Sequence, residues 1–129
     1  MTNKNNKMIT GREIKHHNKN FQGSLDFFQQ ENALLKYRLS EIVDDSEERG
    51  FLQLAEYFQN ELLLNDERLS QLAKRLHLLS DQISTYGKNK NISESFAAIQ
   101  DKFRTDLLEF ETRFLSLSKD FNQKLLQTR

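Results

Sequence analysis

Glu13 and His16 come closest, among the residues of this chain, to a metal-binding or catalytic motif. The spacing Glu-x-x-His places both side chains on one face of a helix, where di-iron helical bundles use such pairs as ligands. A complete site needs a second Glu-x-x-His and two more inward carboxylates. The other histidines are His17 and His77, and the residue three before His77 is Lys74. We therefore predict no metal site, no cofactor and a solvated polar segment here.

His77 and Asp81 are a second pair that could do chemistry, because they stand four residues apart. At that spacing the two side chains meet on one face of a helix. A general base also needs a cleft, which a narrow helical bundle does not offer. We predict a boundary histidine that pairs with Asp81 at the surface, no catalytic residue and no enzyme activity.

The composition excludes several other chemistries. The 129 residues include no cysteine, which excludes disulfides, zinc–thiolate sites, iron–sulfur clusters and thiol catalysis. Lys+Arg and Asp+Glu both number 19, so the net charge gives no general attraction to nucleic acid or membranes. No apolar run of about 18 residues is present to span a membrane, and the N-terminus lacks the apolar core of a secretory signal. We expect a cytoplasmic protein with no membrane partner.

A basic N-terminal arm is the candidate phosphate-contacting segment. The bases within residues 1–19 are Lys4, Lys7, Arg12, Lys15 and Lys19. Lysine and arginine bind phosphates of any sequence, so a nucleic-acid-associated protein is the alternative function. No aromatic ring precedes Phe21, so the arm has nothing on which bases could stack.

Long helices must position all of these residues, and the chain permits them because it has no proline and four glycines. From Phe51 to Ile83, core-type positions recur at alternating spacings of four and three, and Asn65 is the one polar member. That heptad repeat predicts one long helix, over about 46–84, with one buried stripe.

A single helical bundle domain over 10–129 accounts for the whole pattern. Similar stripes predict helices over about 24–43 and about 92–127. Residues 1–9 are Asn- and Lys-rich and are predicted to be a disordered tail. Residues 10–23 continue the first stripe weakly, so both helix and tail are open there.

The second and third stripes match as the two arms of a hairpin. If the chain folds back through 85–91, stripe positions meet where residue numbers sum to about 175–176, as for Phe58 and Leu117. In the third stripe, the core-type positions Ile99, Phe103 and Leu107 follow one another at two consecutive spacings of four, which predicts a local stutter. Both helices are apolar beyond a two-stranded stripe, which favours three or more helices around a core. We predict an all-α, elongated up-down-up three-helix bundle, that is, an antiparallel coiled-coil hairpin plus one helix; a homodimer that pools helices is the alternative.

Asn32 and Asn65 occupy core positions in apolar stripes. A buried asparagine lowers stability and can fix register or oligomeric state. If paired residues of the first two helices sum to about 97, these asparagines share a layer and can bond each other; if the sum is about 93, Asn65 faces Phe28. We predict a structural register role for both in preference to a binding role.

Phe27, Leu34 and Arg38 form the candidate partner-binding patch. Phe27 and Leu34 lie seven residues apart, off the main stripe, and Arg38 lies beside them. Aromatic residues and arginine carry much of the binding energy of protein interfaces. The alternative is that these side chains complete the bundle core or a homodimer contact.

The segment from Ser24 to Ile83 resembles a group of small uncharacterised bacterial helical proteins. The similarity lies in Glu31-Asn32 to Leu39-Ser40-Glu41-Ile42-Val43 and in Ala55-Glu56-Tyr57-Phe58-Gln59-Asn60-Glu61-Leu62. It covers about half of the chain and implies no activity, cofactor or functional residue.

These patterns favour a non-catalytic helical interaction or scaffold protein whose partner is a second copy or another helical protein. The long stripes, the surplus apolar width and the lack of a catalytic motif are the grounds. The alternatives are a nucleic-acid-associated protein, which would lose salt-dependent binding when residues 1–19 are deleted, and a metal-binding helical bundle, which would carry stoichiometric iron or manganese.

Overall fold

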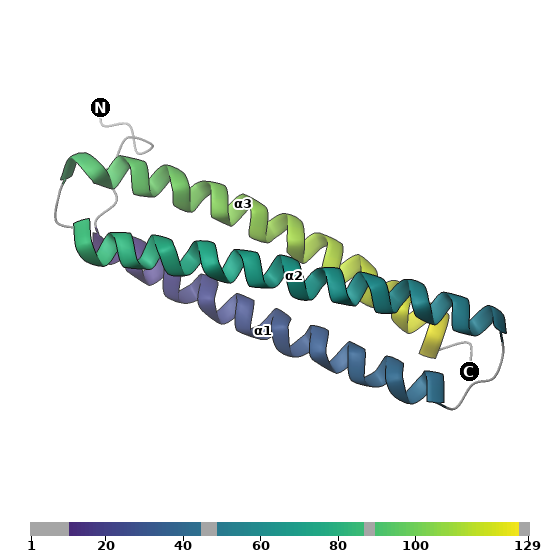
Figure 1. Cartoon of the computed structure of the whole chain (residues 1–129). Coiled ribbons are helices and arrows are strands. Elements are labelled where there is room, and N and C mark those ends of the chain that lie inside the picture. Colours follow the sequence, from purple (N-terminus) through teal and green to yellow (C-terminus); the bar gives the residue numbers. More distant parts are fainter. Residues whose placement is uncertain (1–10, 45–48, 87–89, 127–129) are drawn as a thin grey trace.

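Every residue that the structure describes is helical. The structure is a computed structural model, and it describes residues 11–44, 49–86 and 90–126. The elements are α1 (Gly11–Asp44), α2 (Arg49–Tyr86), α3 (Lys90–Phe121) and a π-helical turn, η2 (Asn122–Leu126). α1 and α3 run parallel, and α2 runs antiparallel to both (Figure 1). The prediction of an all-α, elongated up-down-up three-helix bundle is confirmed.

α1 extends to the N-terminal side of the helix predicted over 24–43. Residues 11–23, for which the sequence leaves helix and tail open, form the first part of α1. Ile14 and Phe21 are buried there, and Ile14 belongs to a cluster that includes Phe96. Their burial offsets the entropy cost of ordering these turns. The tail predicted over 1–9 lies outside the described residues.

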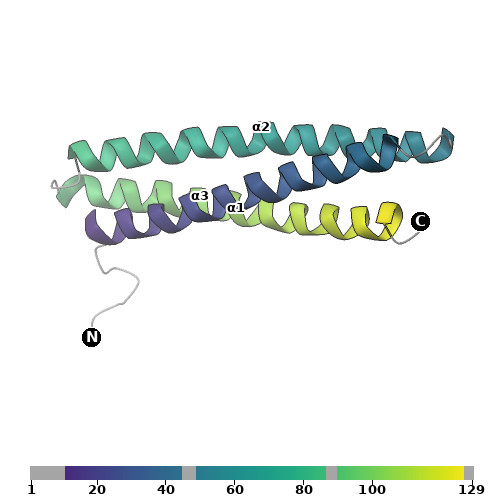
Figure 2. The ribbon, with the colours of Figure 1, turned by 90° about the horizontal axis from the view of Figure 1, so that it is seen from below.

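The core follows the predicted stripes of α1 and α2. Each stripe residue of these two helices is buried, except Phe51, which is half-buried. Phe28 of α1 packs its ring against Phe110 and Phe114 of α3, each at 5.5 Å between ring centroids. In Figure 2, α1 runs obliquely across α2 and α3, which is the twist that a heptad repeat imposes on packed helices.

α3 differs from its predicted stripe. Ile99, predicted for the core, is 47% exposed, and Gln100 is 1% exposed in its place. Core spacing from Phe96 through Gln100 to Leu107 is therefore a regular four, three, four, and the stutter predicted at Phe103 does not occur. The reason is that Gln100 finds buried hydrogen-bond partners on α1, as described below.

The pairing of α2 with α3 also differs, by about one helical turn. The Phe58 ring contacts Phe121 at 5.4 Å between centroids, four residues beyond the predicted Leu117, which is half-buried. The predicted pairing is counted from the 85–91 loop and considers α2 and α3 alone. In the structure, the rings of Phe110 and Phe114 must also pack against Phe28 of α1. Beyond Phe121, the wider turn of η2 directs Leu125 into the core.

Candidate interaction surfaces

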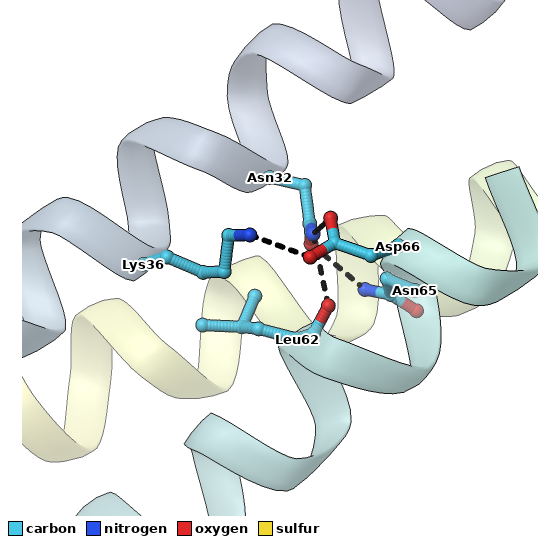
Figure 3. Close-up of polar contacts among 5 residues, drawn as sticks. All are labelled: Asn32, Lys36, Leu62, Asn65 and Asp66. Atoms are coloured by element: carbon cyan, nitrogen blue, oxygen red, sulfur yellow. Dashed lines mark hydrogen bonds and ion pairs between the residues drawn. The ribbon is translucent and has the colours of Figure 1, made fainter. Parts of the chain in front are cut away.

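Asn32 and Asn65 share a core layer between α1 and α2 (Figure 3). Asn65 Nδ2 donates to Asn32 Oδ1 at 3.2 Å. Asn32 Nδ2 donates to the carbonyl oxygen of Leu62 at 2.9 Å and to Asp66 Oδ1 at 2.8 Å. The two asparagines are 0% and 4% exposed. Of the two alignments that the sequence leaves open, the structure has the one in which these residue numbers sum to 97.

Charged side chains connect this layer to the surface. Lys36 pairs with Asp66 across the α1–α2 contact, and Arg68 Nη1 donates to Asn65 Oδ1 at 3.4 Å (Figure 3 shows the Lys36 pair). Within the described residues, no buried side-chain nitrogen or oxygen lacks a hydrogen-bond partner. A fully paired buried network is satisfied in one alignment, which is the geometry that a register role requires.

A second polar layer lies two heptads before Asn32 on α1. Gln100 Nε2 donates to Asn18 Oδ1 at 2.9 Å and to the carbonyl oxygen of Ile14 at 3.1 Å. Asn18 Nδ2 donates to Ser80 Oγ at 3.5 Å. The hydrophobic pattern did not indicate Gln100, because the neighbouring Ile99 is apolar; a strict heptad phase, carried back from Phe103, was the signal that could have found it.

Asp106 links α2 and α3 from outside the core. Its carboxylate lies 2.8 Å from Arg75 Nη1 of α2 and 2.8 Å from Lys102 Nζ of α3, and its side chain is 20% exposed. The hydrogen bond from Lys102 is the main cause that lowers the pKa of Asp106 below its ordinary value of 3.8. Partial burial opposes this effect, and the bond from Arg75 adds to it.

Asp106→Asn is expected to destabilise the bundle in a pH-dependent way. Because the pKa of Asp106 is lower in the folded than in the unfolded chain, its stabilisation is present above the unfolded value and is lost as pH falls through the folded value. The difference in unfolding free energy between wild type and variant should therefore be largest near neutral pH and shrink below about pH 4. Urea unfolding across this range measures it, with the exposed Glu109→Gln as control. A difference that does not change with pH would contradict the role of the charge.

The candidate patch of Phe27, Leu34 and Arg38 is exposed along α1. Phe27 is 55% exposed and Leu34 41% exposed, and Arg38 is also exposed. Phe27 and Leu115 of α3 line one hollow of about 420 Å³. Leu115 is 58% exposed, and Leu108, one heptad earlier on the same side of α3, is 55% exposed. We name Phe27, Leu34, Leu108 and Leu115 the α1/α3 strip. Because these four side chains are exposed, they do not complete the bundle core.

Three of the five bases of the predicted arm lie on α1, and the other two lie outside the described residues. Arg12, Lys15 and Lys19 are exposed on α1, whereas Lys4 and Lys7 lie outside the described residues. The phosphate-contacting role of the arm stays a prediction.

The polar pairs considered for chemistry lie at the surface. His77 Nε2 is 3.3 Å from Asp81 Oδ2, and both side chains are largely exposed. His16 is exposed, and its ring lies 6.1 Å from that of His17. Within residues 11–44, 49–86 and 90–126, no group of three or more His, Cys, Asp or Glu side chains could hold a metal ion.

Comparison with known proteins finds no family model, curated protein or solved structure that matches the chain. The resemblance of residues 24–83 to small bacterial helical proteins therefore stays a prediction. Among the described helices, none is long and apolar enough to cross a membrane.

Proposed function

We propose that this protein is a non-catalytic helical scaffold that binds another helical protein through the α1/α3 strip. The observation that carries the proposal is the row of four large apolar side chains left exposed on a bundle whose described core is packed and fully hydrogen-bonded. Contiguous apolar side chains at a surface are typical of interaction sites.

The groove between α2 and α3 is a poorer candidate. Its hollow is lined by charged side chains that include Arg75, Asp106 and Arg113. A partner there would have to displace water from ion-paired groups, which costs free energy. The hollow that Phe27 and Leu115 of the α1/α3 strip line has instead one charged lining residue, Glu111.

A helix is the partner that the shape of the strip favours. Its two rows, Phe27 with Leu34 and Leu108 with Leu115, each repeat at seven residues on parallel helices. An amphipathic helix with apolar residues at matching spacings can lie between such rows. Burying the exposed halves of four such side chains contributes roughly 3–6 kcal/mol before the costs of association. That magnitude suits a reversible complex better than a permanent one.

Site-specific photo-crosslinking tests the proposal in cells. We expect benzoylphenylalanine in place of Leu34 or Leu115 to give a discrete adduct of higher mass, because both positions face the partner. The exposed positions Gln30 and Thr112, outside the strip, are matched controls and should give none. Failure of both strip positions to give an adduct in folded protein, or equal adducts from all four positions, would contradict the proposal.

A further inference from the structure

The outer groove between α1 and α2 carries opposite charges at its two ends. Four exposed bases lie toward the N-terminus of α1: Arg12, Lys15, Lys19 and Lys74. Three exposed acids lie toward the C-terminus of α1: Asp44, Glu56 and Glu67. None of the seven forms an ion pair or hydrogen bond with another described residue. We call this surface the α1/α2 face.

The heptad phase places the bases of α1 on this face. Lys36 and Ser40 line a hollow between α1 and α2. Lys15 lies three heptads before Lys36, and Lys19 lies three heptads before Ser40. In a supercoiled bundle, residues seven apart keep the same side of their helix. Lys74 of α2 lines a second hollow in the same groove.

The acids belong to the same face at its other end. Asp44 and Glu56 line the same hollow as Lys36, and Glu67 lies one heptad before Lys74 on α2. The acids lie at the opposite end of the face from the bases, because α2 runs antiparallel to α1 (Figure 1). The early part of α2 therefore lies beside the late part of α1.

Other charged side chains on the face change this pattern little. The paired ones are Lys36 with Asp66 and His77 with Asp81. Acids that lie near the bases are Asp26, which accepts a hydrogen bond from Gln22, and Glu13, which stands between Arg12 and Lys15 in the sequence. The face is thus positive at one end and negative at the other, although the whole chain has no net charge.

We propose that the α1/α2 face binds a second copy of the chain, antiparallel about a twofold axis. In that arrangement the basic end of each copy meets the acidic end of the other, and the symmetry makes the contact twice. A parallel arrangement would bring like charges together, which disfavours it. The chemistry of the face is self-complementary in one orientation only.

The dimensions and apolar content of the face suit a dimer. α1 has 34 residues, or about 50 Å of helix, and two helices side by side are about 20 Å across, which gives on the order of 800–1,000 Å² for each copy. Stable interfaces bury about 800 Å² per partner. Hollows of about 620 and 590 Å³ lie along the groove, with Leu78 at one and Leu52 and Leu63 at the other, all three exposed. Apolar contacts thus supply attraction, and the charges set the orientation.

This contact is independent of the proposed function, because the α1/α3 strip lies on the other side of α1. A dimer joined through the α1/α2 face would leave two strips free, one on each copy. The scaffold would then be bivalent toward its helical partner.

Two charge-reversal variants test the antiparallel contact. The basic-end variant is Lys15→Glu with Lys19→Glu, and the acidic-end variant is Glu56→Lys with Glu67→Lys. All four positions are exposed, so helical circular dichroism should be unchanged. In sedimentation at low ionic strength, we expect each variant alone to dissociate at least roughly tenfold more readily than wild type, because both ends then repel. A 1:1 mixture should restore the dimer as a heterodimer, because opposite charges meet again at both ends.

The control is Arg113→Glu with Lys119→Glu on α3, which makes the same change of charge away from the face and should leave the dimer unchanged. A wild-type chain that stays monomeric, or a mixture no more associated than either variant alone, would overturn the proposal. A monomeric wild type that binds a DNA duplex, with binding lost in the basic-end variant, would overturn it too and assign the bases to nucleic acid. Crosslinking from Leu34 and Leu115 reports on the proposed function separately.

Discussion

Phe28→Ala is expected to lower the free energy of unfolding by about 3–5 kcal/mol, whereas Phe27→Ala next to it should change it by less than about 1 kcal/mol. Phe28 is 5% exposed, and its ring packs against Phe110 and Phe114 of α3. Its removal leaves a cavity at the contact that holds α1 on the hairpin. Phe27 is 55% exposed and loses little packing.

Urea unfolding followed by helical circular dichroism measures both variants under identical conditions. Because the two substitutions remove the same atoms from adjacent positions, helix propensity and composition are matched. Equal losses of stability would contradict the claim that Phe28 faces the core while Phe27 faces solvent. They would also contradict the exposure of the α1/α3 strip.

Replacement of Asn32 by leucine is expected to cost about 1–3 kcal/mol, because Asn65 is left buried without its partner. Asn65→Leu alone should cost a similar amount, because the buried Asn32 Oδ1 then loses the hydrogen bond that Asn65 Nδ2 donates. The double variant Asn32→Leu with Asn65→Leu should be close to wild type in stability, because neither amide remains. A double-mutant cycle should therefore show a coupling of about 2–6 kcal/mol between the two positions, which is the sum of the two single losses.

The double variant should lose alignment rather than stability. A layer of leucines packs in either register, whereas the paired amides are satisfied in one. Amide spectra of wild type should show one peak for each residue of α1, and those of the double variant doubled or broadened peaks. A double variant with single sharp peaks throughout α1 would contradict the register role of Asn32 and Asn65.

The stripes of α1 and α2 could be predicted from the sequence because burial on a long helix follows directly from a seven-residue repeat. Phe58, Leu62 and Leu69 are buried for that reason alone. The pairing of Asn32 with Asn65 could be posed as a choice of two alignments, since each register fixes which residues meet. The partner patch on α1 was visible too, because Phe27 and Leu34 are apolar residues off the stripe.

Gln100 was missed because hydrophobicity alone does not identify a buried amide, whose partners come from another helix, in this case Asn18 and the backbone of Ile14. A one-dimensional pattern counts Ile99 as the better core residue. The α3 half of the strip was hidden for a related reason. Whether Leu108 and Leu115 face the core or solvent depends on the side from which α1 docks, which no single helix records.

Light scattering of the full chain, at several concentrations and at low and high ionic strength, tests most directly whether this bundle works by assembly. We predict a species of twice 15.3 kDa at low ionic strength that falls toward 15.3 kDa as salt screens the ends of the α1/α2 face. A mass of 15.3 kDa at every concentration and ionic strength would contradict assembly through that face.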